Sequence, residues 1–150
     1  MANLIGSFYS DMTKKTVKPE LFDTTAKHIA STLAASKVNP RNNRVIKNGV
    51  SSTQLRRLFD EIKSYERILK SEGSQSWDKY YPYVLMIKSK TAYSVERSIR
   101  KNKWDKEYYK ALQNFINDGI DLIKDETDYH VFVALFEAVY GFYYENAPKD

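Results

Sequence analysis

The sequence predicts an all-α protein, a single five-helix bundle, and three observations favour this class. Only five glycines and four prolines occur in 150 residues, whereas residue types that favour helices are abundant. Apolar residues recur at spacings of three and four along five segments, as in helices with one buried face. No stretch alternates between apolar and polar residues for long enough to indicate a sheet. The length fits one domain over residues 1–150.

The N-terminal third is predicted to hold an arm, a helix and a loop. Residues 1–17 show no clear period, and we expect a flexible or partner-ordered arm there. The first helix is expected over about residues 19–36, with Pro19 in its first turn. Asn39 and Pro40 should end it, because a residue before proline is pushed out of helical geometry. The asparagine-rich segment NPRNNRVIKNGV then reads as a loop with Gly49 in a tight turn.

Capping signals place the second helix. Ser51 and Gln54 have the spacing of a capping box, in which a hydroxyl accepts from the third backbone N–H and the glutamine reaches back to the cap. This predicts a helix from about residue 52 to residue 69.

Three further helices are predicted in the remainder of the chain. They cover about residues 82–101, 105–124 and 128–144, with Thr127 as the cap of the last one. The apolar face of the first of these three is expected to hold Val84, Leu85, Ala92, Val95 and Ile99. Lys88 is an exception on that face, where it can extend its head group to water along a packed stem.

The absence of cysteine excludes disulfides and thiolate metal sites and favours a reducing, cytoplasmic setting. The start of the sequence lacks the basic-then-apolar order of a signal peptide, and no run of about 18 apolar residues occurs. We therefore expect a soluble intracellular protein without a membrane partner.

Charges are segregated along the chain, although the net charge of +5 is moderate. Residues 24–59 contain seven basic residues and no acidic residue, and residues 88–106 contain seven basic residues against Glu96 and Asp105. From Asn117 onward eight acidic residues face Lys124 and Lys149. A merely solvated surface would mix the two signs, so this pattern favours binding of a charged partner.

Two basic elements are candidate nucleic-acid contacts. The first is a phosphate-binding corner around the start of the second helix, and the second is a stripe along the third helix with an aromatic residue within it. Together they comprise Arg41, Arg44, Lys47, Arg56, Arg57, Lys90, Tyr93, Arg97, Arg100 and Lys101. Backbone binding independent of sequence needs several cationic groups on a rigid face and gains from aromatic rings. A local alternative is that Arg56 pairs with Asp60 and Arg57 with Glu61, each pair contributing about 0.3 kcal/mol.

The sequence offers little for catalysis. His28 and His130 are the two imidazoles, and no phosphate-binding loop, nucleophile elbow or zinc spacing occurs. No arginine stands four to six residues before either histidine, as it does in one family of helical ribonucleases. We expect no catalytic residue, no metal ligand and no cofactor. A protein-interaction module with a solvated basic surface and an all-α nuclease with an unrecognised site remain alternatives.

Several motifs together resemble the small subunit of type III-A CRISPR interference complexes, the Csm-type effectors. They are NGVSSTQLRRLFDEI, YVLMIKSKTAYSVERS, FINDGIDLI and VFVALFEAVYGFYY, within about residues 40–147. Arg56, Lys90, Tyr93 and Arg97 match the family's pattern. Gln54 replaces a lysine of that pattern, and Val95-Glu96 replaces a pair of small residues.

The resemblance implies a prokaryotic protein that folds as a five-helix bundle and has no catalytic role. It further implies that the protein holds crRNA and target RNA through contacts to their phosphates and sugars. It also implies association with other subunits of the effector complex and with additional copies of itself, stacked in a filament. We expect the acidic C-terminal segment to contact neighbouring subunits, including the basic face of the next copy.

Overall fold

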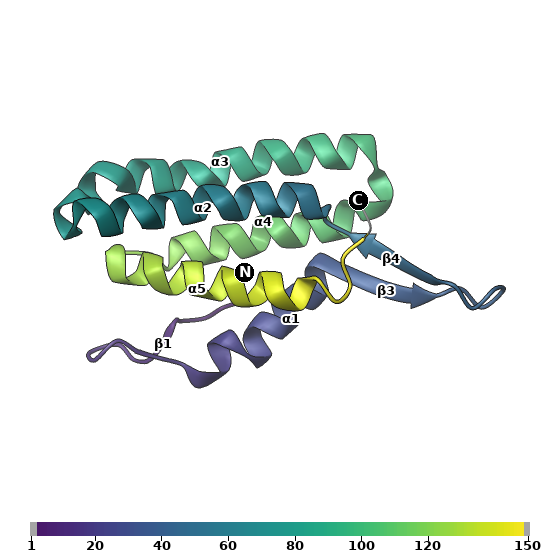
Figure 1. The fold of residues 1–150 in the computed structure, drawn as a ribbon, viewed down its shortest axis with the longest axis horizontal. Coiled ribbons are helices and arrows are strands. Elements are labelled where there is room, and N and C mark those ends of the chain that lie inside the picture. Colours follow the sequence, from purple (N-terminus) through teal and green to yellow (C-terminus); the bar gives the residue numbers. More distant parts are fainter. Residues whose placement is uncertain (1–2, 149–150) are drawn as a thin grey trace.

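Helices make up most of the protein in the computed structural model, which describes residues 3–148 (Figure 1). The α-helices are α1 (Thr24–Leu33), α2 (Ser52–Glu72), α3 (Trp77–Lys101), α4 (Lys106–Asp121) and α5 (Glu126–Tyr143). Short 3₁₀ helices cover Pro19–Phe22, Ser74–Ser76 and Lys103–Asp105. Two antiparallel strand pairs join them, β1 (Tyr9–Asp11) with β2 (Thr16–Val17) and β3 (Ala34–Val38) with β4 (Val45–Gly49). The protein is therefore mostly α, and the prediction of a purely all-α bundle is confirmed only in part.

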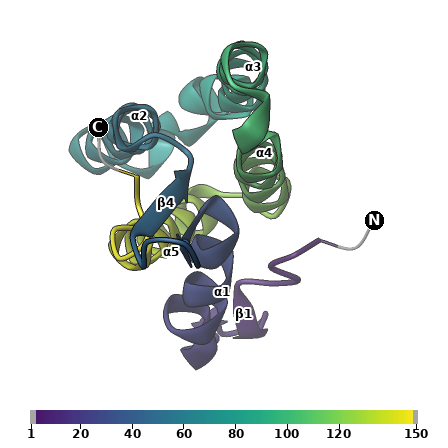
Figure 2. The same cartoon turned by 90° about the vertical axis from the view of Figure 1, so that its right-hand side faces the viewer.

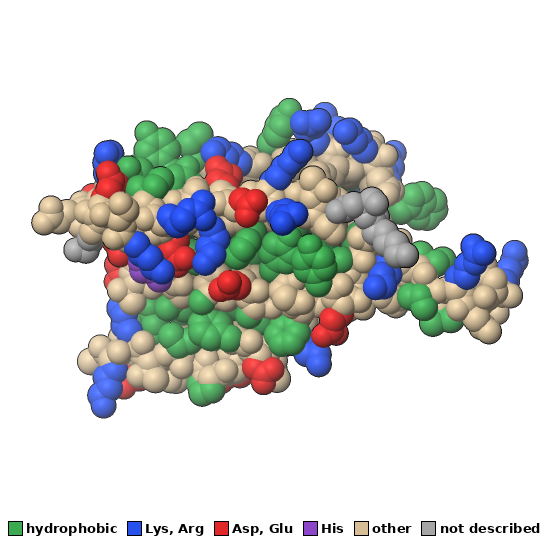
Figure 3. Space-filling view, viewed as in Figure 1, with side chains coloured by type: hydrophobic (Ala, Val, Ile, Leu, Met, Phe, Trp, Pro, Cys, Tyr) green, Lys and Arg blue, Asp and Glu red, His purple; other side chains and the backbone are tan. Residues whose placement is uncertain are grey.

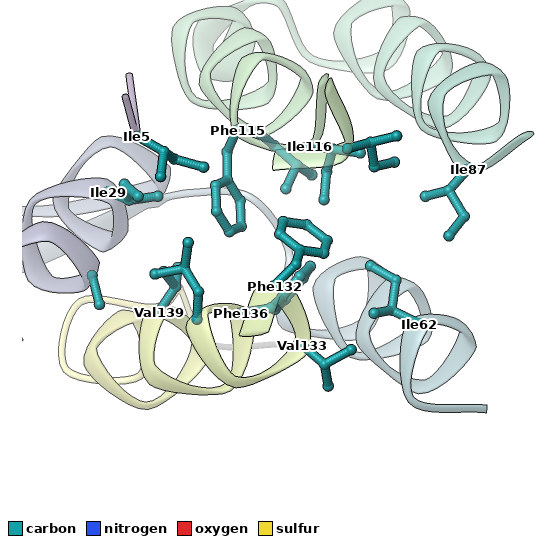
Figure 4. Close-up of a cluster of buried hydrophobic side chains, with 14 of the residues drawn as sticks. Ile5, Ile29, Ile62, Ile87, Phe115, Ile116, Phe132, Val133, Phe136 and Val139 are labelled. Atoms are coloured by element: carbon teal, nitrogen blue, oxygen red, sulfur yellow. The ribbon is translucent and has the colours of Figure 1, made fainter. Parts of the chain in front are cut away.

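The helix α5 is the centre of the bundle. It packs against α1, α2 and α4, while α3 packs mainly on α4 (Figure 2). Phe132 and Phe136 of α5 and Phe115 of α4 form an aromatic cluster in the core, with ring centroids 5.5–5.7 Å from Phe115 (Figure 4). Both α5 rings are fully buried. This central position explains why α5 is apolar around much of its circumference.

The segment predicted as a loop after the first helix is a β-hairpin. Strands β3 and β4 pair in register from Ala34 opposite Gly49 to Val38 opposite Val45, and the hairpin projects from one end of the bundle (Figure 1). Asn39 closes the connecting loop through its backbone N–H, which donates to the Arg44 carbonyl at 2.8 Å. The strands are too short, and too exposed at Val38 and Val45, to alternate visibly in the sequence.

Gly49 also differs from its predicted place in a tight turn. It ends β4 with φ of 144°, and a Cβ there would overlap the Leu33 carbonyl and Ala34. Glycine is needed at this position because two backbone segments approach each other closely.

We predicted an arm over residues 1–17, of which residues 1 and 2 lie outside the described part; parts of residues 3–17 pack against the bundle, whereas Leu4 and Met12 are exposed. Phe8 and Tyr9 are buried, and the Tyr9 hydroxyl donates to Asp128 of α5 at 2.6 Å. Lys15 Nζ donates to Asp125 Oδ2 at 2.5 Å and to Asp128 Oδ1 at 3.1 Å. These contacts join the first strand pair to the start of α5.

Several helix ends differ from the predictions. Pro19 does begin a helical turn, but that turn is 3₁₀, and α1 stops at Leu33 because the following residues join β3. The helix α3 begins at Trp77 and includes Pro82 within its length. The cap of α5 is Asp125, whose carboxylate accepts from the Asp128 N–H at 2.9 Å, and Thr127 lies inside the helix.

The buried face of α3 is rotated from the predicted one. Leu85 is 40% exposed, whereas Ile87 and Thr91 are buried. Lys88 forms an ion pair with Asp121 of α4, which explains a lysine beside the apolar stripe. Among the helices of residues 3–148, none combines the length and apolar character that crossing a membrane requires.

Candidate nucleic-acid interface

A groove of about 340 Å³ lies between α2 and α3. On the α3 side its wall includes the small side chains of Thr91, Ser94 and Ser98. These small residues leave open space between α2 and α3. The two helices pack more extensively on α5 and α4, respectively, than on each other. Figure 3 shows Lys and Arg side chains gathered over the C-terminal half of α3, at one edge of this region.

Five of the predicted contact residues line this one groove. They are Arg57 from α2 and Lys90, Tyr93, Arg97 and Lys101 from α3. The spacing of the α3 residues, three or four apart, places them on one side of the helix. The structure therefore brings half of the predicted site together.

Of the other five predicted residues, four lie away from this groove and Lys47 lies in a hollow beside it. Arg41 and Arg44 are exposed in the loop at the tip of the β3–β4 hairpin, and Arg100 is exposed near the end of α3 without lining the groove. Arg56 lies on the side of α2 that faces Tyr140 of α5. Burial and a hydrogen bond with Tyr144 raise the pKa of the Tyr140 phenol, the positive charge of Arg56 opposes this rise, and the resulting pKa is about 12.

Lys47 lines a second hollow, of about 370 Å³, beside the first. Both hollows are lined by Gln54, Ser98, Lys101 and Tyr109. Together they form a continuous surface from the base of the hairpin to the middle of α2. We call this surface the basic groove.

A hydrogen-bond network forms the wall shared by the two hollows. The Ser51 hydroxyl accepts from the Gln54 N–H at 3.2 Å, which confirms half of the predicted capping box. The Gln54 side chain does not complete it, because its Nε2 donates to Ser98 Oγ at 2.5 Å and its Oε1 accepts from the Tyr109 hydroxyl. That hydroxyl accepts from the Ser51 N–H at 3.1 Å. The network ties α2, α3 and α4 together beneath the cations.

Several cations of the basic groove are free to meet a polyanion. Within residues 3–148, Arg57, Arg97 and Lys101 have no carboxylate within 4 Å. The guanidinium of Arg97 lies 5.8 Å from the centroid of the Tyr93 ring, a cation–π distance.

Glu61 neutralises one cation of the groove. Its carboxylate accepts from Lys90 Nζ at 2.5 Å, and this hydrogen bond raises the Lys90 pKa. The local alternative of Arg56–Asp60 and Arg57–Glu61 pairs is wrong, because neither pair forms among the described residues.

The wall also holds an orphan hydroxyl. Thr91 is 2% exposed, and its Oγ1 has no hydrogen-bond partner in the described part of the chain. Sequence reasoning missed Thr91 and the Gln54–Ser98–Tyr109 network, because only helix packing brings these residues together.

Neither histidine belongs to the groove. His28 is exposed on α1, whereas the ring nitrogens of His130 lie 3.2 Å from Glu66 and 3.0 Å from Glu126. Within residues 3–148, no three His, Cys, Asp or Glu side chains lie together so that they could hold a metal ion.

A protein-family model matches most of the chain. The model of the family Csm2 Type III-A matches residues 16–147. No curated protein and no solved structure matches the chain. The family match covers the hairpin, all five helices and every predicted contact residue. The chain therefore belongs to the Csm2 type III-A family, the small subunits of type III-A CRISPR Csm complexes.

Proposed function

We propose that this small subunit is non-catalytic and binds the backbone of crRNA and target RNA in the basic groove, independently of sequence. The observation that carries the proposal is the convergence of Arg57, Arg97 and Lys101, free of carboxylates, on one groove. Family membership supports the proposal, because the resemblance to small subunits of Csm-type complexes implies a place beside crRNA and target RNA.

The chemistry of the groove suits phosphate more than base edges. Lysine and arginine heads neutralise phosphates and release counterions, and such contacts carry no sequence information. Tyr93 is 65% exposed beside Arg97, which suits packing on a sugar or a base face. A guide-programmed complex has to accept any sequence, so contacts of this kind fit its task.

Fluorescence anisotropy with labelled single-stranded RNA across a salt series tests the proposal. The test variant carries alanine at Arg57, Arg97 and Lys101. A matched control carries alanine at Lys14, Lys27 and Lys124, which are exposed outside the groove. It removes the same charge from the chain. We expect the groove variant to bind weakly with a flattened salt dependence, whereas the control binds almost as the unmodified protein does.

Each alternative predicts a different result. A protein-interaction module with a solvated basic surface predicts equal RNA affinity of the groove variant and its control. A nuclease predicts cleavage of the labelled RNA by the purified chain when divalent metal is added. Either result would overturn the proposal.

Stacking with additional copies is a second part of the proposal. Much of the acidic C-terminal segment is used within the chain, since Asp121 pairs with Lys88, Glu126 contacts His130, and Asp125 and Asp128 hold Lys15. Glu137 and Glu145 remain exposed. Their charges are free to meet the basic face of a neighbouring copy.

Charge reversal tests the contact between copies. Replacing Glu137 and Glu145 by lysine is expected to lower the number of copies in the purified complex, whereas their replacement by glutamine should lower it less. Unchanged stoichiometry in the lysine variant would rule out these residues as the contact.

A further inference from the structure

Trp104 is the most exposed large apolar side chain of the structure. It belongs to the 3₁₀ helix Lys103–Asp105 between α3 and α4, and it is 93% exposed, whereas Trp77, the other tryptophan, is 8% exposed. An indole is usually buried, because its large apolar surface is stabilising only when it is removed from water. No predicted site and no part of the hydrophobic core includes Trp104.

The backbone holds this side chain out on an ordered corner. The Trp104 N–H donates to Asn102 Oδ1 at 3.1 Å, and Asn102 Nδ2 donates to Asp105 Oδ2 at 2.9 Å. The Asn102 N–H continues α3 by donating to the Ser98 carbonyl at 2.9 Å. The backbone that carries the indole is therefore set by the fold, so little backbone entropy would be lost when a ligand stacks on it.

The charges around Trp104 favour a polyanion over an apolar partner. Four exposed cations lie within four residues of it in the chain: Arg100, Lys101, Lys103 and Lys106. In the described part of the chain none of them has a carboxylate within 4 Å. A protein that buried this indole would have to desolvate or neutralise these charges, whereas phosphates neutralise them directly.

Trp104 also stands beside the basic groove. The second hollow of that groove is lined by Lys101, Asn102 and Asp105, so its wall includes residues of the turn on both sides of Trp104 in the chain. A strand whose phosphates follow the groove past Lys101 would bring a base to this corner.

We propose that Trp104 is a stacking platform for a nucleobase of the RNA that follows the basic groove. This inference rests on the proposed function and adds a contact to the base itself. Stacking on an indole is available to every base, because every base has a π face, so the contact tolerates any sequence. Stacking of one base on an aromatic ring is expected to change affinity about 5- to 150-fold.

Base-dependent quenching of tryptophan fluorescence tests the platform. The purified chain is titrated with a uridine oligomer and with an abasic ribose-phosphate oligomer of equal length. Because Trp77 is buried, we expect the uridine oligomer to quench Trp104 and the abasic oligomer to quench it far less. By anisotropy, Trp104→Leu should bind the uridine oligomer at least about 5-fold more weakly with an unchanged salt slope. Trp104→Phe should lose less affinity for the uridine oligomer than Trp104→Leu does, because its ring can still stack. Affinity for the abasic oligomer should be equal in all three proteins.

The two proposals fail in different ways. If Trp104→Leu binds both oligomers as the unmodified protein does, the platform is wrong while the groove stands. If this variant is lost from the assembled complex with its RNA affinity intact, Trp104 contacts a protein and the platform is wrong. If neither oligomer binds in a salt-dependent manner, the proposed function and the platform fail together.

Discussion

Arg56 and Arg57 are consecutive residues of α2, but they serve different sides of that helix. Arg57 lines the groove beside α3, whereas Arg56 acts on Tyr140 of α5. Successive residues of a helix point about 100° apart, so one pair of arginines cannot reach a single narrow groove together. The two arginines therefore provide a comparison in which the removed charge is the same and only the face differs.

Alanine at Arg57 is expected to weaken RNA binding more than alanine at Arg56. One phosphate contact contributes about 0.7 to the salt slope with single strands, so Arg57→Ala should lower the slope by about that amount. Anisotropy at several salt concentrations measures both quantities. Equal effects of the two variants would show that the groove is not the contact surface.

Removal of the Glu61 charge is expected to tighten RNA binding. Glu61 lines the groove and accepts a hydrogen bond from Lys90. Its carboxylate therefore repels phosphate and also neutralises the charge of Lys90. Glu61→Gln should raise affinity and steepen the salt dependence. Glu137→Gln removes the same charge from an exposed site on α5 and should change affinity less. A weaker-binding Glu61 variant would contradict the proposed role of Lys90.

Valine at Thr91 is expected to stabilise the protein. The Thr91 hydroxyl is buried without a partner among the described residues, and an unsatisfied buried polar group costs about 1 kcal/mol or more. Valine has nearly the same shape without that group, so the free energy of unfolding should rise by about 1 kcal/mol. Urea denaturation measures it. A loss of stability would show that the hydroxyl has a partner, such as a bound water.

Alanine at Gly119 is expected to destabilise the bundle, whereas alanine at Gly141 should stabilise it. A Cβ at Gly119 of α4 would overlap the Phe132 ring, but one at Gly141 of α5 would meet open space. Overpacking costs about 1–3 kcal/mol, and alanine gains about 1 kcal/mol over glycine within a helix. Thermal unfolding of the two variants should therefore shift in opposite directions. Similar shifts would contradict the close approach of α4 and α5.

Acid is expected to loosen the N-terminal strand pair. Burial raises the pKa of Asp125, but the hydrogen bonds from Lys15 and the Asp128 N–H outweigh it, so the pKa lies below its ordinary value. The Lys15 pKa is raised, chiefly by its hydrogen bond with Asp125. A lowered carboxyl pKa stabilises the fold above the ordinary pKa of about 4. This contribution to stability is lost as the pH falls through the lowered pKa that Asp125 has in the folded protein.

Asp125→Asn tests this pair, because asparagine still caps a helix. The carboxylate of Asp125 is 48% exposed, so its pair with Lys15 is worth at most about 1 kcal/mol. The variant should unfold at a lower temperature than the unmodified protein at pH 7, and the difference should shrink as the pH falls below about 4. A difference that persists in acid would assign the effect to the cap.

The sequence predicted the helices well because each has a long apolar stripe, as in α2 and α5. It missed the β3–β4 hairpin, whose five-residue strands are largely exposed, and it missed the packing of residues 3–17, whose contacts lie more than 100 residues away in the chain. Six of the ten predicted contact residues line the basic groove, because helical spacing places the four from α3 on one face; their role in RNA binding stays a prediction. Gln54, Thr91 and Tyr109 were not predicted, since their role depends on how three helices meet.

The β3–β4 hairpin gives the protein a reach beyond its bundle. Five residues per strand at about 3.3 Å each hold the Arg41–Arg44 loop about 17 Å from the base of the hairpin at Gly49, which lines the groove. A short oligonucleotide can occupy the groove or meet the loop, but it cannot bridge both. Affinity should therefore grow with RNA length in a step, and the length at that step would measure the span of one subunit along its strand.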